Sequence, residues 1–298
     1  MSVVEKAIQK LRSEKVAAGE APTAPPHSAP EASAVREPAT VPVTGAARAT
    51  GAAITLDRAA LRAAGLMPPE EEYSLIARQY RAIKHPLIAP AIGRGVPRAP
   101  KGYLIMIASA MPGEGKSFTA LNLALSLSVE KDIRVLLVDA DVAKPQLSRE
   151  LGLAKAPGLL DALRDTSIDV EALIHPSDVP TLSFLPAGSG AEEATELLSS
   201  ARMQQIANSL GQRDAQRIVV FDSPPLLQTT ESLALARIAG QIVVVVRAES
   251  TPQPVLLDAL KTLGNHPAIS LVLNQSEHGG TSGYYYGYGG ERTAPPGA

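Results

Sequence analysis

The chain of 298 residues contains no cysteine and no tryptophan, and only three phenylalanines. Without cysteine, disulfide bonds, thiolate metal ligands and cysteine nucleophiles are all excluded. No run of about 18 apolar residues occurs, and the N-terminus lacks the apolar core of a signal peptide. We therefore expect a soluble protein in the cytoplasm, which would associate with a membrane only through a partner protein.

The chain also lacks an excess of charge of either sign. Its 28 Lys and Arg residues nearly balance its 30 Asp and Glu residues, so the formal net charge is −2. Binding to nucleic acid usually requires a strongly basic surface, and this composition predicts no nucleic-acid partner. The length is sufficient for one sizeable α/β domain with extensions.

Residues 1–17 are predicted to form a short amphipathic helix. A helix of this length is marginal by itself, so the segment is either frayed or docked on a partner. Its apolar side chains recur at helical spacing with charges on the opposite face: Val4, Ala7, Ile8 and Leu11.

Residues 18–69 are rich in Ala and Pro and are predicted to be a disordered linker. Within it, the stretch 53–65 has the composition of a short helix. The next helix is expected to begin at the acidic residues 70–72 and to end before Pro86, because proline disfavours a continuing helix.

From Tyr103 onward, apolar runs alternate with helical patterns. Continuous apolar strands separated by helices indicate a mainly parallel sheet that is covered on both faces. The predicted fold class for residues 70–275 is therefore a doubly wound α/β domain of the P-loop NTPase type. The runs are "YLIMIAS", "RVLLVD", "LSFLPAG", "RIVVFD", "QIVVVVR" and "ISLVLNQ", and helices are expected at 117–129, about 195–210, 230–239 and 253–264.

The loop "AMPGEGKS" connects the first of these strands to a helix, as a phosphate-binding loop does. Successive backbone N–H groups can surround phosphates there, and the helix N-terminus adds positive potential. Lys116 should reach the β- and γ-phosphates, and the Ser117 hydroxyl should bind Mg²⁺. ATP and Mg²⁺ are the expected cofactors. The expected nucleotide contacts are Pro112, Gly113, Glu114, Gly115, Lys116, Ser117, Phe118 and, at the end of the last strand, Asn274.

Three aspartates follow apolar strands at the edge of the sheet where ligands bind in such folds. Asp139 and Asp141 follow "VLLV", and Asp222 follows "IVVF". A single aspartate at a strand end is more often a turn or cap residue, but three on the phosphate side favour a catalytic site. We predict Lys116, Asp139 and Asp141 as catalytic residues, and Ser117, Asp139 and Asp222 as metal ligands.

Four of the seven tyrosines lie in the stretch "GGTSGYYYGYGG" near the C-terminus. Glycine raises the entropic cost of ordering, so residues 276–298 are predicted to be a flexible tail. Such a stretch is a sticky low-complexity tail, a membrane-interface anchor, or a tethered substrate. From Asn274 to Tyr288 the extended chain spans at most about 50 Å, enough to reach the active site of a neighbouring subunit.

Taken with the loop and the aspartates, this tail resembles the bacterial tyrosine kinases, the cytoplasmic autokinases of capsule and exopolysaccharide systems. Ala110–Ser117, Asp139–Asp141 and Asp222–Pro225 resemble their Walker A, A′ and B motifs. The resemblance covers about residues 71–290 and is greatest to the subgroup found beside exosortase-type loci.

It implies an ATP-dependent tyrosine autokinase that regulates exopolysaccharide synthesis or export. The implied partners are other copies of the chain bound through tail and active site, a transmembrane activator resembling chain-length regulators, and a protein tyrosine phosphatase. The implied phosphorylation sites are Tyr284, Tyr285, Tyr286 and Tyr288.

The chain departs from the family pattern at two places. The family usually has Arg after the second Asp of the A′ motif, where this chain has Ala143 followed by Lys144. The family also has a Glu-x-x-Arg-x-x-Arg pattern that helps to assemble rings. The corresponding residues here are Arg78, Arg81 and Lys84, so the acidic residue of the pattern is missing.

Two other functions fit the same nucleotide-binding motifs. Partition and septum-positioning ATPases have a signature Lys after the first residue of the loop, where this chain has Met111. A non-catalytic nucleotide-binding regulator of polysaccharide export is the remaining alternative.

Overall fold

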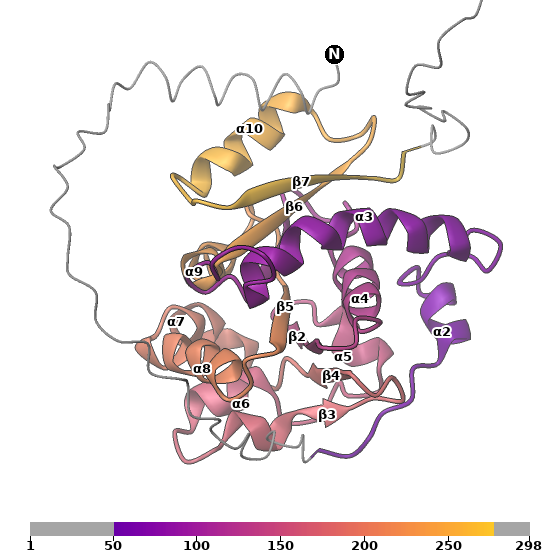
Figure 1. Cartoon of the computed structure of the whole chain (residues 1–298). Coiled ribbons are helices and arrows are strands. Elements are labelled where there is room, and N and C mark those ends of the chain that lie inside the picture. Colours follow the sequence, from indigo (N-terminus) through magenta and orange to yellow (C-terminus); the bar gives the residue numbers. More distant parts are fainter. Residues whose placement is uncertain (1–50, 277–298) are drawn as a thin grey trace, which may run out of the picture.

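The computed structural model describes residues 51–276. A seven-stranded sheet with the strand order β3-β4-β2-β5-β1-β6-β7 forms its centre (Figure 1). All neighbouring strands are parallel except β3 and β4. This confirms the predicted mainly parallel α/β fold. The strands are β1 (Leu104–Ser109), β2 (Arg134–Asp139), β3 (His175–Pro176), β4 (Leu182–Leu185), β5 (Arg217–Asp222), β6 (Gln241–Arg247) and β7 (Ile269–Asn274).

Helices cover both faces of the sheet. In β1, Leu104, Met106 and Ala108 face one hydrophobic core and Ile105 and Ile107 face the other, as alternation along a strand requires. The first core includes residues of α6, α8, α9 and α10, and the second includes residues of α2, α3, α4 and α5. The helices are α2 (Arg58–Ala63), α3 (Tyr73–Ile92), α4 (Lys116–Leu127), α5 (Gln146–Glu150), α6 (Leu159–Arg164), α7 (Ala194–Leu198), α8 (Ala201–Gln212), α9 (Thr230–Ile238) and α10 (Gln253–Thr262), with 3₁₀ turns η1 (Val170–Leu173) and η2 (Ala191–Glu193).

Among the helices of residues 51–276, none has the length and apolar character needed for a bilayer span. The helix predicted at residues 1–17 and the tyrosine cluster lie outside the described part of the chain.

The linker predicted for residues 18–69 is wrong for its last part. Leu56, Leu61 and Leu66 are buried in the second core, and Ile54 bridges to Ser177 beside β3. The side chain of Asp57 caps α2 by accepting hydrogen bonds from the backbone of the first turn. The short helix expected within residues 53–65 is present as α2, but composition does not indicate that this segment packs in the core, because its few large apolar residues are widely spaced.

Two predicted helices have different bounds in the structure. The helix expected to end before Pro86 continues through it to Ile92, because Leu87, Ile88 and Ala91 are buried and packing of that last stretch outweighs the cost of an interior proline. The helix expected at about 195–210 is two helices, α7 and α8. Ser200 separates them and caps α8, since its hydroxyl accepts a hydrogen bond from the N–H of Met203.

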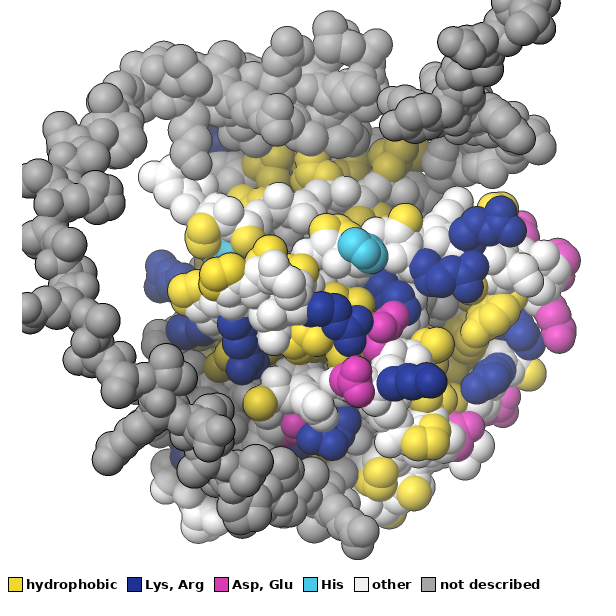
Figure 2. All heavy atoms as spheres, in the orientation of Figure 1, with side chains coloured by type: hydrophobic (Ala, Val, Ile, Leu, Met, Phe, Trp, Pro, Cys, Tyr) yellow, Lys and Arg dark blue, Asp and Glu magenta, His cyan; other side chains and the backbone are white. Residues whose placement is uncertain are grey.

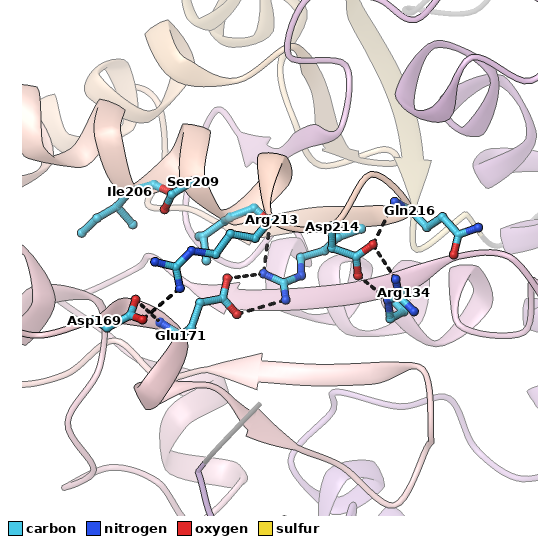
Figure 3. Close-up of polar contacts among 10 residues, drawn as sticks. Arg134, Asp169, Glu171, Ile206, Ser209, Arg213, Asp214 and Gln216 are labelled. Carbon is cyan, nitrogen blue, oxygen red and sulfur yellow. Dashed lines mark hydrogen bonds and ion pairs between the residues drawn. The ribbon is translucent and has the colours of Figure 1, made fainter. Parts of the chain in front are cut away.

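Ion pairs anchor the amino ends of β2 and β5, at the edge of the sheet opposite the carboxyl ends (Figure 3). Arg217 and Glu171 are both buried and form a bidentate pair, with N–O distances of 2.5 and 3.0 Å. Arg134 pairs with Asp214, with 2.6 Å between Nη2 and Oδ1. These pairs position the two strands that carry Asp139 and Asp222 at their other ends.

Candidate active site

The phosphate-binding loop connects β1 to the first residue of α4, Lys116. Gly113 and Gly115 have φ angles of 80° and 95°, the left-handed region that favours glycine. A Cβ atom at Gly115 would lie 2.0 Å from Nδ2 of Asn274. Only glycine fits at this position, and the loop adopts the strand–loop–helix context that the sequence predicts.

The side chain of Glu114 stabilises the conformation of this loop. Its Oε2 accepts a hydrogen bond of 2.7 Å from the N–H of Met111, and its Oε1 accepts one from the hydroxyl of Thr251. Asn274 donates to the backbone oxygen of Glu114 at 2.9 Å. The side chains of Glu114 and Asn274 are therefore engaged with the loop and its supports, and neither lines the phosphate cavity.

A cavity of about 490 Å³ lies over the loop and the carboxyl ends of β2 and β5. This volume is in the range of small-molecule sites. Of the predicted residues, Pro112, Gly113, Lys116, Ser117 and Asp141 line it. Ala143, Lys144 and Pro225, which the A′ and B motifs include or adjoin, also line it. The other lining residues, which no sequence motif indicated, are Pro145, Gln146, Arg149, Gln228 and Thr229.

Asp139 and Asp222 lie side by side beneath the cavity, because they are register partners at the ends of β2 and β5. Both are fully buried. Ser148 donates two hydrogen bonds to Oδ2 of Asp139, while Oδ1 of Asp139 and both oxygens of Asp222 have no hydrogen-bond partner. Unpaired buried carboxylates are costly in the ionised form, so a proton or a bound cation would stabilise this pair.

Burial and neighbouring charges raise the pKa values of all three aspartates. Burial raises the pKa of Asp222, and the neighbouring charge of Asp139 raises it further. Burial also raises the pKa of Asp139, although the hydrogen bonds from Ser148 oppose the shift. The pKa of Asp141 is raised by burial against the opposing charge of Lys116. Positive charge brought to this site would favour the ionised forms.

These residues fit a Mg²⁺ ion. Hard carboxylate and hydroxyl oxygens are its preferred ligands, and unpaired oxygens of Asp139 and Asp222 lie at one edge of the sheet with Ser117 nearby. Between residues 51 and 276, no three His, Asp or Glu side chains converge on a shared metal position. A Mg²⁺ ion here would take its other ligands from nucleotide phosphates and water, which is its usual mode of binding.

Comparison with known proteins identifies the family. A model of an AAA domain matches residues 102–265. The tyrosine-protein kinase YwqD of Bacillus subtilis is 31% identical over 220 residues, which are 73% of this chain and 89% of YwqD. The chain belongs to the bacterial tyrosine-protein kinase family. This confirms the family that its loop, aspartates and tail resemble.

Some relatives are much longer than the region that matches this chain. EpsB of Ralstonia nicotianae is 35% identical over 189 residues, which are 62% of this chain but only 24% of EpsB. Among solved structures, the BceF tyrosine kinase domain is 28% identical, with a TM-score of 0.58, over 73% of this chain and 86% of that domain. The likeness therefore lies in the kinase domain.

Proposed function

We propose that this chain is an ATP-dependent protein-tyrosine autokinase of an exopolysaccharide system. One observation carries the proposal: a phosphate-binding loop ending in Lys116 and Ser117 faces three buried aspartates, in a chain that has four clustered tyrosines near its C-terminus. The family resemblance of the motifs supports the link to exopolysaccharide synthesis or export.

In the proposed reaction, the tyrosine oxygen forms a bond to the γ-phosphorus of ATP. The bond from that phosphorus to the bridging oxygen breaks, and ADP leaves. The Lys116 ammonium and the backbone N–H groups of the loop hold the phosphates and stabilise the developing charge. Bound Mg²⁺ would neutralise charge on the β- and γ-phosphates, held by Ser117, Asp139 and Asp222.

Asp141 is better placed than Asp139 to accept the proton of the tyrosine hydroxyl. Asp141 lines the cavity, whereas one oxygen of Asp139 is taken up by Ser148 and the side chain does not line the cavity. Burial raises the pKa of Asp141, which strengthens it as a base when it is ionised.

The path of the chain favours delivery of the tail to this site. Asn274 is the last residue of β7 and touches the phosphate-binding loop, so the chain leaves the sheet at the nucleotide edge. Tyr284 lies only ten residues further along the chain, outside the described residues. A tether of this length supplies an effective concentration on the order of millimolar for a site within reach.

We further propose that unmodified tails hold copies of the chain together by lying in one another's sites. Four phosphotyrosines would add about −6 to −8 charges, which the aspartates and nucleotide phosphates would repel. A membrane-embedded activator and a tyrosine phosphatase complete the proposed cycle. Light scattering should find smaller particles after ATP treatment than after phosphatase treatment, and equal masses in both would contradict this assembly.

The decisive experiment is incubation of the full chain with Mg-ATP, followed by mass spectrometry of the C-terminal peptide. Phosphate on residues 284–288 is expected in the wild-type protein and not in Lys116→Met or Asp139→Asn, with unchanged circular dichroism in both variants. Full phosphorylation of either variant would overturn the proposed site. ATP hydrolysis without phosphotyrosine would favour an ATPase switch, and nucleotide binding without either reaction would favour a regulator.

A further inference from the structure

A small apolar groove lies between α3 and the end of α4. Its walls include Ile76, Ala77 and Tyr80 from α3, Leu125 from α4, and Val129 from the turn that follows. The ten residues from Lys116 to Ser126 place this part of α4 about 15 Å along the helix from the phosphate cavity. On the face drawn in Figure 2, apolar side chains lie among basic and acidic ones.

The groove is exposed and has no function in the proposed reaction. Val129 is 76% exposed and Tyr73, which also lines the groove, is 43% exposed. The volume of the groove is about 100 Å³. Ligand pockets usually have about 300–1,000 Å³, and an apolar cavity of about 150 Å³ accommodates benzene. The size therefore fits an aliphatic side chain of a docked peptide.

Charges of opposite sign lie at the two ends of the groove. Glu70, Glu71 and Glu72 are exposed directly before α3, where Glu70 also pairs with Arg62 at 3.7 Å. Arg81 lines the groove about two turns further along. Lys84 is turned inward: its Nζ donates to the backbone oxygen of Ser126 at 2.7 Å and pairs with Glu130 at 2.9 Å. A docked peptide would therefore meet negative charge at the start of α3 and Arg81 at the other end.

We propose that the N-terminal segment of this same chain, residues 4–15, docks in this groove as an amphipathic helix. Such helices bind grooves through apolar anchors at positions i, i+4 and i+7, which Val4, Ile8 and Leu11 supply. The segment carries six charged residues with a net charge of +2, and its basic residues predominate toward the end: Glu5, Lys6, Lys10, Arg12, Glu14 and Lys15.

The charges also specify a direction. With the segment antiparallel to α3, Glu5 lies toward Arg81, and Arg12 lies toward the glutamates at residues 70–72. Along the helix axis, Glu5 and Arg12 are about 10 Å apart, and Glu72 and Arg81 are about 13 Å apart. The difference of about 3 Å is within the reach of long charged side chains, so both pairs can form together. A parallel arrangement would place like charges together at both ends.

The intervening chain is long enough for this docking. Residues 16–50 comprise 35 residues, which span up to about 120 Å when extended. The described domain has 226 residues, for which the expected radius of gyration is about 17 Å. The segment can therefore reach any face of its own domain, and its tethering raises its effective concentration to about millimolar. This favours the chain's own segment over an untethered partner.

Because the chain has no cysteine, disulfide trapping can test this docking directly. In the full chain, Ile8→Cys with Val129→Cys should form a disulfide within one molecule. The control, Gln9→Cys with Val129→Cys, shares the same tether but places its thiol about 100° further around the helix. The first pair should close at least about tenfold faster, because docking holds only its thiols in reach. Equal rates for the two pairs would overturn the proposal.

A charge exchange tests the direction. Disulfide formation should slow several-fold when all three glutamates at residues 70–72 are replaced by lysine. It should be restored when three basic residues of the segment are also replaced, in Lys10→Glu, Arg12→Glu and Lys15→Glu. Salt should weaken both effects. No restoration would overturn the antiparallel docking.

Mixing chains that carry only one of the two cysteines distinguishes the occupants, because linkage between chains as fast as that within a chain would assign the groove to a second copy. No readout uses phosphate transfer, so failure here leaves the proposed kinase activity untouched.

Discussion

Ser148 holds one oxygen of Asp139 in place with two hydrogen bonds, both 2.8 Å long, from its backbone N–H and its hydroxyl. The same hydroxyl oxygen accepts a hydrogen bond of 3.0 Å from the N–H of Ala187, beyond the end of β4. Oδ2 of Asp139 is thereby satisfied, and Oδ1 is left without a protein partner. Ser148 is a positioning residue for the predicted metal ligand.

We expect Ser148→Ala to raise the Mg²⁺ concentration needed for half-maximal autophosphorylation by about tenfold, because Asp139 loses one of the two hydrogen bonds that fix its rotamer. The free energy of unfolding should fall by about 1–3 kcal/mol, since a buried N–H and a carboxylate oxygen lose a partner. Titration of initial rates with Mg²⁺ is the measurement. Ser128→Ala, which removes another buried hydroxyl, should leave the Mg²⁺ requirement unchanged. Equal effects of both variants would assign Ser148 a purely structural role.

Asp222→Asn should abolish the part of nucleotide binding that depends on Mg²⁺. At 100 times its Kd, Mg-ATP stabilises a folded protein by about 2.7 kcal/mol, or about 5–10 °C in Tm for a domain of this size. We expect this shift for the wild-type protein in Mg-ATP, and in Asp222→Asn no difference between Mg-ATP and ATP with EDTA. Asp258→Asn, on the exposed surface of α10, is the control. A full Mg²⁺-dependent shift in Asp222→Asn would exclude this aspartate as a ligand.

Gly115→Ala should destroy nucleotide binding, because the new Cβ would lie 2.0 Å from Nδ2 of Asn274 and the backbone φ of 95° disfavours alanine. Adding Asn274→Ala removes the clash but leaves the backbone strain of about 1–2 kcal/mol. We therefore expect the double variant to regain part of the affinity, as measured by fluorescent-nucleotide titration. Wild-type affinity in the single variant would show that the loop moves freely away from β7.

Arg217→Met should lower the free energy of unfolding by about 3–5 kcal/mol, because it leaves the carboxylate of Glu171 buried without its partner. The double variant with Glu171→Leu should lose much less, since neither charge remains. Urea denaturation of the two variants measures the difference. Losses of equal size would mean that the hydrogen bond from Arg217 to the backbone oxygen of Leu210, which both variants lack, and not the ion pair, stabilises this edge of the sheet.

The sequence by itself determined the parallel α/β fold and the order of its site-bearing elements. Apolar runs, a glycine loop before a helix and aspartates after strands are local patterns, and parallel strands bring their carboxyl ends to one edge whatever the details of packing. For this reason the placement of Lys116, Ser117 and Asp141 around one cavity was predictable from the chain alone.

Only the tertiary structure decided which residues support that site. Asn274 contacts Glu114 across 160 residues of sequence, and Ser148 reaches Asp139 from a short helix that has no periodic signal of its own. Packing likewise buries Leu61 in a segment with a linker's composition and carries α3 through Pro86. Such outcomes depend on which surfaces meet when the chain is compact, and the free energy of burial then outweighs local preferences that the sequence displays.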